Sequence, residues 1–228
     1  MNPWDFDLHL FDLDDTLIHT RSVYLAAQET ALSQVFAGQS PAQHQARAER
    51  VKFLSRAFGS SRVDQYLDAF LLDESDDPKQ RDRLRLALKE VYTQEYWGKL
   101  NARDGAIAWL EQLKSKGKAW GLVSNGDPQL QEKKLQATGL SEWFPLEKRW
   151  VSGSFDPQLK KPNPFMIQEA LKTLGYTAGQ SVYYGNIPED VIAAHLAGVQ
   201  CCFLGALPPK LPPMAQPERV IQNWMELK

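Results

Sequence analysis

Short apolar runs recur along this chain and alternate with segments of helical periodicity. The runs cover residues 8–11, 119–123, 150–151, 182–184 and 199–204. Near-continuous apolar runs of this length are typical of parallel strands buried on both faces, because the crossovers between parallel strands place helices there. The pattern therefore predicts an α/β fold with a doubly wound, Rossmann-like parallel sheet.

Turn and cap residues indicate where the connecting segments begin and end. Asp127 followed by Pro128 predicts the start of one helix, and Gly139 predicts its end. A proline-rich stretch at 208–213 then predicts a linker that leads to a C-terminal helix over 217–227.

One region interrupts the alternation of strands and helices. From about residue 20 to 97 no strand signal appears, and helical patterns dominate; Asp77 and Pro78 open the last of these helices. We therefore predict two domains: an α/β core formed by residues 1–19 and 98–228, and an inserted α-helical domain over residues 20–97.

Composition excludes several classes of function. A net charge of −2 over 228 residues provides no basic surface for nucleic acid. No apolar stretch approaches the roughly 20 residues that cross a bilayer, so no membrane partner is expected. Asp5 and Asp7 stand where a secretory signal would be basic, which makes the cytoplasm the expected compartment.

Cys201 and Cys202 are adjacent and would point to opposite faces of a strand, so we expect buried thiols rather than a disulfide.

Three carboxylates follow the first apolar run within four residues: Asp12, Asp14 and Asp15. At the end of a buried strand they repel one another, and folding alone gives no reason to place them there. A cation offsets this repulsion, and Mg²⁺ prefers carboxylate and carbonyl oxygens. The alternative is a polar turn whose acids cap the next helix.

Further polar groups stand close to the ends of later apolar runs. They are Ser124 with Asn125, Lys161 before Pro162, and Asn186 with Asp190. Because ligands of open α/β sheets bind outside the carboxyl ends of the strands, we expect these groups to converge with Asp12 on one crevice. Taken singly, each group has a structural interpretation as a turn, a helix cap or a surface lysine.

In this order, the four motifs resemble those of the haloacid dehalogenase-like (HAD) hydrolase superfamily, in the phosphatase-like group with an α-helical cap. The motifs are Asp12-Leu13-Asp14-Asp15-Thr16, Leu122-Val123-Ser124-Asn125-Gly126, Lys161-Pro162 and Tyr184-Gly185-Asn186-Ile187-Pro188-Glu189-Asp190. The resemblance covers essentially the whole chain. It implies an Mg²⁺-dependent enzyme whose cap admits a small phosphorylated metabolite.

The resemblance also implies a role for each motif residue. Asp12 would be the nucleophile that forms an aspartyl-phosphate, and Asp14 the general acid and then the general base. Ser124 and Lys161 would act in catalysis, and together with Asn125 they would bind the phosphate. The implied metal ligands are Asp12, Asp14 through its backbone carbonyl, Asn186 and Asp190.

One position departs from the family pattern. The residue after Gly185 is usually an Asp that binds the metal, whereas Asn186 supplies an oxygen without a charge. We therefore expect weaker metal binding, with Asp190 or Glu189 compensating directly or through water.

Three functions stay open: a phosphatase, a degenerate member that binds a phosphorylated ligand with little turnover, and a phosphomutase, which shares the first half-reaction. Asp14 argues against dehalogenation.

Overall fold

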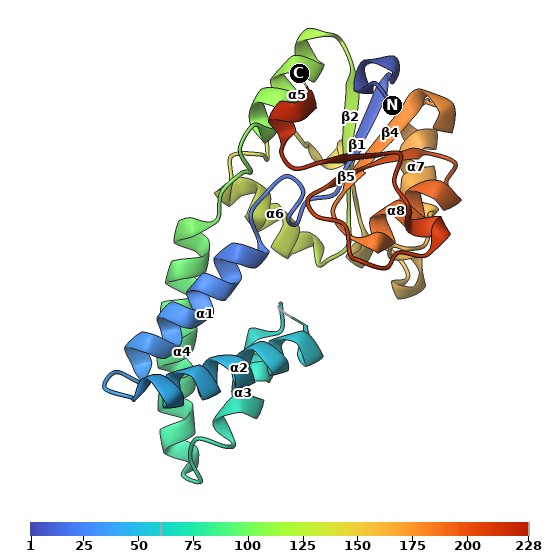
Figure 1. The fold of residues 1–228 in the computed structure, drawn as a ribbon. Helices are drawn as coiled ribbons and strands as arrows, with labels where there is room; N and C mark the ends of the chain where they lie inside the picture. Colours follow the sequence, from blue (N-terminus) through green and yellow to red (C-terminus); the bar gives the residue numbers. More distant parts are fainter. Residues whose placement is uncertain (60, 228) are drawn as a thin grey trace. The chain divides into compact units, whose positions relative to one another are not determined.

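A computed structural model describes residues 1–59 and 61–227, which form two compact units (Figure 1). The α/β unit combines residues 1–19 with the chain from 101 onward, and the helical unit spans residues 20–100. The boundary that the sequence predicted at residue 97 falls within a helix that continues to Lys99.

A six-stranded parallel sheet forms the centre of the α/β unit. Its strands are β1 (Leu8–Phe11), β2 (Ala119–Ser124), β3 (Arg149–Val151), β4 (Ser181–Gly185), β5 (Gln200–Leu204) and β6 (Arg219–Ile221), in the spatial order β3-β2-β1-β4-β5-β6. Phe11 of the central strand β1 is level with Leu122 of β2 and with Tyr184 of β4. The strand order reverses at β1, and such a switch point is where ligands bind in sheets of this kind. The predicted α/β fold class is confirmed.

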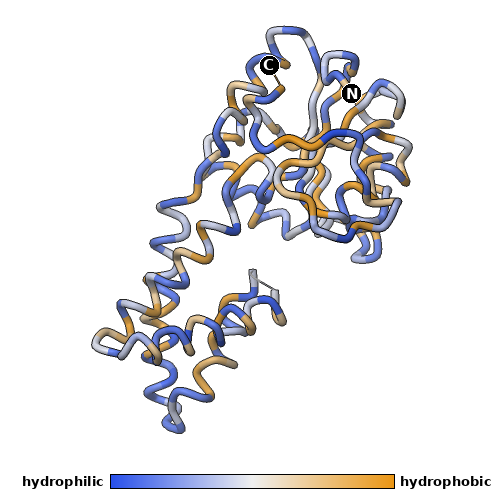
Figure 2. Tube along the Cα trace, viewed as in Figure 1, coloured by the Kyte–Doolittle hydropathy of each residue, from blue (hydrophilic) through white to orange (hydrophobic). Residues whose placement is uncertain are grey.

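The strands are hydrophobic because helices cover both faces of the sheet. All residues of β1 and β4 are buried, and Figure 2 shows long hydrophobic stretches in this part of the chain. Leu8 and Leu10 belong to a core with α7 (Phe165–Leu174) and α8 (Pro188–Leu196). On the other face His9 and Phe11 contact the aromatic rings of α5 (Ala106–Ser115) and of the C-terminal segment.

Local signals account for the remaining elements of this unit. Helix α6 (Pro128–Ala137) begins where the sequence predicted, because the Asp127 side chain accepts a hydrogen bond from Leu130 N at 2.9 Å. Cys201 and Cys202 in β5 are buried free thiols, as expected. Short 3₁₀ turns complete the unit: Pro3–Asp5, Leu146–Lys148, Ser152–Ser154, Pro157–Leu159, Ala178–Gln180, Pro213–Ala215 and Trp224–Leu227.

The prediction of a C-terminal helix over 217–227 is wrong. This segment forms the edge strand β6 and a 3₁₀ turn instead. The reason is tertiary: the edge of β5 offers backbone hydrogen bonds to a strand, and Gly205 N donates to Ile221 O at 2.8 Å. Trp224 then becomes buried, which a free helix on the surface would not achieve.

Within residues 20–59 and 61–100 the helical unit contains four helices, α1 (Arg21–Val35), α2 (Pro41–Phe58), α3 (Val63–Leu71) and α4 (Pro78–Lys99). Ser40 and Gln43 form a capping box at α2, and Asp77 caps α4. Helices α1 and α4 lie side by side, and α2 packs on α3 (Figure 1). Figure 2 shows hydrophobic residues at intervals along otherwise hydrophilic helices, as amphipathic packing requires. No helix in residues 1–59 and 61–227 combines the length and apolarity needed to cross a membrane.

Candidate active site

Asp12 stands directly beyond the central strand. Its backbone N–H donates to Tyr184 O at 2.8 Å and so continues the β1–β4 pairing by one residue. One carboxylate oxygen, Oδ2, lies 3.2 Å from the Thr16 hydroxyl, which can donate to it. The nucleophile predicted from the sequence is therefore a buried carboxylate held at the switch point of the sheet.

Lys161 reaches the same point from the segment before α7, and its side chain is almost fully buried. Its Nζ lies 2.7 Å from Asp12 Oδ1 and 2.6 Å from Asp190 Oδ1. The ammonium also contacts Val123 O at 3.1 Å and the Tyr183 hydroxyl at 2.8 Å. One buried cation thus joins two buried carboxylates that come from different strand ends.

The shared lysine sets the charges of this group. Burial raises the pKa of Asp12 from 3.8 to about 7; Lys161 opposes the shift, while Asp190 and Asp14 add to it. Burial alone would lower the pKa of Lys161, but Asp12 and Asp190 more than offset this and raise it to about 12. The lysine therefore stays charged at neutral pH, and one ammonium has to serve two carboxylates.

Asp190 sits in the first turn of α8 with both oxygens engaged. Oδ1 accepts from Lys161, and Oδ2 accepts from the backbone N–H groups of Asn186 and Ile187 at 2.9 and 3.2 Å. A Cβ at Gly185 would lie 2.4 Å from the Asp190 Cβ, so only glycine admits this close approach. The metal role predicted for Asp190 stays a prediction, and its contacts give it a second task, which is to hold Lys161.

Ser124 ends β2, and Asn125 follows it at the same edge of the sheet. Asn125 Oδ1 accepts from Lys161 N at 2.9 Å, and Asn125 Nδ2 donates to Lys161 O at 3.0 Å. This pair of hydrogen bonds joins the loop after β2 to the segment that carries Lys161. The side chain of Asn125 is thus occupied in positioning the lysine, and the predicted contact with phosphate would come from its backbone N–H.

Asp14 is held by two side chains of α6 that the sequence analysis missed. Lys134 Nζ lies 2.6 and 2.9 Å from the two Asp14 carboxylate oxygens, and Gln131 Nε2 donates to Oδ2 at 3.0 Å. Gln131 Nε2 also lies 2.9 Å from the Ser124 hydroxyl and 3.1 Å from Asn125 O. Their spacing could have revealed them, because residues three apart share a helix face and α6 follows the Ser124 motif directly.

The amide nitrogen of Gln131 makes the contacts of this side chain. It lies within hydrogen-bond distance of three acceptors and has two protons to donate, so the contacts share them. The buried amide oxygen has no protein partner among the residues that the structure describes. The side chain is thus placed for what its nitrogen binds.

Two further residues brace the loop that carries the aspartates. The Arg103 guanidinium donates to Asp15 O at 2.8 Å, and the Trp224 indole N–H donates to Thr16 O at 3.0 Å. Asp15 itself has a φ of 56°, in the left-handed region that L-residues rarely occupy. Neither brace was predicted, because both come from segments far away in the sequence.

The oxygens near Asp12 fit a hard cation. Thr16 Oγ1 lies 3.2 Å from both Asp12 Oδ2 and Asn186 Oδ1, yet a hydroxyl has a single proton to donate. Over residues 1–59 and 61–227, no group of three or more His, Cys, Asp or Glu side chains is arranged to hold a metal. The donors that the structure brings together are the Asp12 carboxylate and the Asn186 amide oxygen, and the Asp14 backbone carbonyl stays a prediction. This set suits Mg²⁺, which needs only one or two carboxylates because it keeps several waters.

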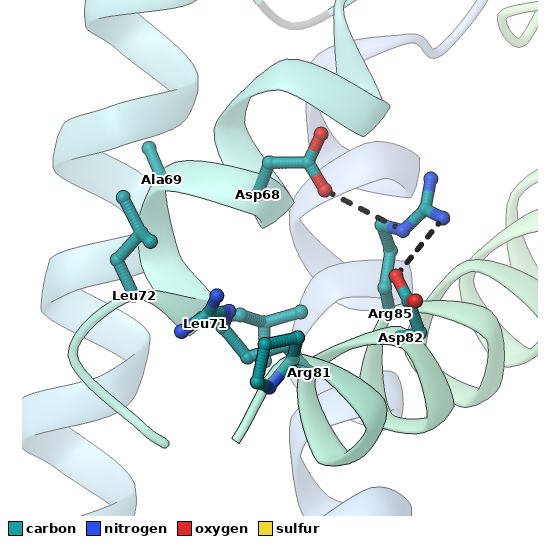
Figure 3. A pocket seen from close by; sticks show the side chains of 8 residues that line it. Asp68, Ala69, Leu71, Leu72, Arg81, Asp82 and Arg85 are labelled. Atoms are coloured by element: carbon teal, nitrogen blue, oxygen red, sulfur yellow. Dashed lines mark hydrogen bonds and ion pairs between the residues drawn. The ribbon is translucent and has the colours of Figure 1, made fainter. Parts of the chain in front are cut away.

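The helical unit has a surface depression of its own between α3 and α4 (Figure 3). Three charged side chains that line it form ion pairs with one another, because Arg85 lies 3.4 Å from Asp68 and 3.5 Å from Asp82. Arg81 in the same wall donates to backbone carbonyls. Arg85, Asp68 and Asp82 are thus engaged with one another, and Arg81 is held by main-chain oxygens.

The comparisons with known proteins agree with this geometry. Residues 9–204 match the haloacid dehalogenase-like hydrolases, so the chain belongs to this family of enzymes. It is 34% identical to a phosphoserine phosphatase of Thermus thermophilus over 100 residues, 43% of this chain and only 39% of that protein. It is 27% identical to a glyceraldehyde 3-phosphate phosphatase of Methanothermobacter thermautotrophicus, covering 86% of this chain and 84% of that one.

A solved structure shows the same fold. The protein YfnB of Bacillus subtilis, described as a crystal form bound to magnesium, aligns with a TM-score of 0.67 at 21% identity. The alignment covers 97% of this chain and 96% of YfnB.

Proposed function

We propose that this chain is an Mg²⁺-dependent phosphomonoester hydrolase that acts on a small phosphorylated metabolite through an aspartyl-phosphate intermediate. The observation that carries the proposal is the buried Lys161 ammonium, 2.7 Å from the Asp12 carboxylate at the switch point of the sheet. Its phosphatase relatives and the magnesium in YfnB support the proposal.

Asp12 would attack the phosphorus of the bound ester. A bond would form between the Asp12 oxygen and phosphorus, and the bond to the leaving alcohol would break. The leaving oxygen would take a proton from Asp14, which would carry that proton only once released from the Lys134 ammonium that contacts both of its oxygens in this structure. Lys161 would stabilise the negative charge on Asp12 and on the transferring group, since it is already fixed and desolvated. Ser124 and the backbone N–H of Asn125 would donate to the phosphoryl oxygens.

The second step would return the enzyme to its starting state. Asp14 accepts a proton from water, the water oxygen bonds to phosphorus, and the Asp12–phosphorus bond breaks. Asp12, the Asp14 backbone carbonyl and Asn186 would hold the Mg²⁺. When bound, the ion supplies positive charge that offsets the charges of the phosphate and of Asp12.

The experiment is phosphate release from p-nitrophenyl phosphate, with and without Mg²⁺, by the wild-type chain and by Asp12→Asn. We expect metal-dependent turnover that the substitution abolishes while the thermal unfolding transition is retained. A panel of small phosphorylated metabolites would then identify the substrate.

A second candidate is a member of the family that binds a phosphorylated ligand with little turnover. It is favoured by Asn186, which leaves the metal donors one charge short. Absence of phosphate release at millimolar Mg²⁺, together with stabilisation of the fold by inorganic phosphate, would contradict the hydrolase and support this candidate.

A further inference from the structure

We infer that Tyr183 is a positioning residue that directs the Lys161 ammonium at the Asp12 carboxylate. The inference rests on the proposed function, in which Asp12 attacks phosphorus and Lys161 stabilises the negative charge. Tyr183 lies in β4, one residue before the motif that begins at Tyr184, and the family resemblance assigns it no role. Its hydroxyl oxygen lies 2.8 Å from Lys161 Nζ.

A count of donors and acceptors shows where the ammonium protons go. The Lys161 ammonium has three protons and accepts none, so the Tyr183 oxygen accepts from it. Four oxygens lie around the ammonium: Asp190 Oδ1 at 2.6 Å, Asp12 Oδ1 at 2.7 Å, the Tyr183 hydroxyl at 2.8 Å and Val123 O at 3.1 Å. The three shortest contacts account for the three protons.

The hydroxyl proton of Tyr183 completes this arrangement. Val123 O lies 2.9 Å from the hydroxyl oxygen and Asp190 Oδ1 lies farther away, at 3.4 Å, so the proton is directed at Val123 O. Val123 O thus has a donor, and the ammonium does not have to turn a proton toward it. Because Asp190 and Tyr183 take two of the ammonium protons, the third is left for Asp12.

Lys161 needs this support because of the segment that carries it. The chain between β3 and α7 forms short 3₁₀ turns rather than a strand or an α-helix, and sites built on such segments are less precise. The Asn125 side chain holds the Lys161 backbone, and Tyr183 holds the other end of the lysine. Tyr183 is itself fully buried in β4, which pairs with β1 and with β5. Its hydroxyl is therefore a fixed point at the centre of the sheet.

The direction of the ammonium matters most when Asp12 bonds to phosphorus. The attacking oxygen has to lie in line with the bond that breaks, and a displacement of about 1 Å can reduce a rate about a hundredfold. A ligand that occupies the site without bonding to Asp12 depends much less on this alignment. Loss of the Tyr183 hydroxyl should therefore impair the reaction more than it impairs the binding of phosphate.

Tyr183→Phe tests the inference, and Tyr184→Phe is the matched control. Both residues are fully buried tyrosines of β4, and each change removes one hydroxyl group. The Tyr184 side chain lies on the opposite face of the sheet, with its hydroxyl 3.0 Å from His9 Nδ1.

The measurement is a calorimetric titration of the wild type and both variants with orthovanadate and with inorganic phosphate, in the presence of Mg²⁺. Orthovanadate can take a fifth oxygen ligand from a carboxylate and so imitates phosphorus in the transition state, whereas phosphate occupies the site without that bond. The steady-state constants kcat and KM for p-nitrophenyl phosphate are measured on the same proteins.

We expect Tyr183→Phe to weaken orthovanadate binding about tenfold and phosphate binding less than about threefold. For p-nitrophenyl phosphate, kcat should fall about tenfold while KM changes less than about threefold. Tyr184→Phe should leave the ratio of the two dissociation constants unchanged, although it also removes a buried hydrogen bond. A dissociation constant fitted together with the stoichiometry does not depend on the fraction of folded protein, so partial misfolding cannot imitate the result.

Two results would overturn the inference. Tyr183→Phe could weaken phosphate binding as much as orthovanadate binding, which would indicate a role in binding phosphate or in the general structure of the site. It could also leave the ratio unchanged, as Tyr184→Phe should. Either result leaves the hydrolase assignment intact if the wild type releases phosphate and Asp12→Asn does not. If the wild type released no phosphate, the proposed function would fail, and this inference would fail with it.

Discussion

The two units of this chain differ in how deeply their ion-paired side chains are buried. In the α/β unit Lys161, Asp12 and Asp190 form a buried cluster, and the side chains of Lys161 and Asp190 are at most 1% exposed. In the helical unit no ion pair of the described residues is buried to this degree: Arg47 and Glu74 are 23% and 15% exposed, and Lys89 and Asp64 are 45% and 50% exposed. Water already stabilises the surface charges, whereas a buried charge depends on its partner. Charges that a fold buries at a strand end therefore indicate a site, and those on helix surfaces do not.

The largest effect expected from this difference follows removal of the shared lysine. Lys161→Met leaves two buried carboxylates without their cation and should lower the free energy of unfolding by about 3–5 kcal/mol. Phosphate release should also be lost. The matched change Lys89→Met breaks a surface pair and should cost at most about 1 kcal/mol. Urea unfolding of both variants measures the two losses in the free energy of unfolding. Equal losses would contradict this prediction.

A buried histidine should make the stability of the α/β unit sensitive to acid. Desolvation of the fully buried His9 lowers its pKa from 6.5 to about 4, and its Nδ1 is 3.0 Å from the Tyr184 hydroxyl. Between these pH values the unfolded chain binds the proton and the folded chain does not. The wild type should therefore lose about 3 kcal/mol, relative to His9→Phe, as the pH falls from 6.5 to 4.

Urea unfolding of the wild-type and His9→Phe proteins at several pH values checks this. The difference between the two proteins isolates the histidine, because Asp12 titrates in both. A difference that does not vary with pH would show that His9 is charged, or solvated, in the fold.

Two Gly→Ala substitutions compare the closely packed site around Gly185 with helix α4, where Gly98 has free space around it. Gly185→Ala would bring a Cβ within 2.4 Å of the Asp190 Cβ and should cost about 1–3 kcal/mol, with a loss of activity because Asp190 holds Lys161. In α4, Gly98 has nothing within 4 Å of a Cβ, so Gly98→Ala should stabilise the helix by up to about 1 kcal/mol. Opposite signs in thermal unfolding are the expected result, and a neutral Gly185→Ala would contradict the packing argument.

The smallest expected effect is a change in the apparent affinity for Mg²⁺. Asn186→Asp adds a carboxylate beside Asp12 and should tighten apparent Mg²⁺ affinity about tenfold, because hard cations prefer charged oxygens. Calorimetric titration of both proteins with Mg²⁺ above pH 7, where Asp12 is ionised, measures it. Weaker binding by the variant would show that residue 186 lies outside the metal shell.

Prediction from the sequence worked best where local and tertiary signals agreed. Strands β1 to β5 and the start of α6 at Pro128 were predictable, because apolar runs and helix caps act within a few residues. The helix expected over 217–227 was not found, because the free edge of β5 outweighs local preference. The braces from Arg103 and Trp224 were invisible in the sequence, because no local pattern marks a contact between distant segments.

By itself, the sequence determined the α/β class and the order of the four motifs, because hydrophobic periodicity and residue type can be read locally. The tertiary structure alone decided that Lys161 is shared between Asp12 and Asp190 and that Lys134 is held against Asp14. Such pairings depend on which strand ends and helix faces meet when the sheet assembles. The pKa of Asp12 likewise depends on burial and on neighbours that are distant in the chain.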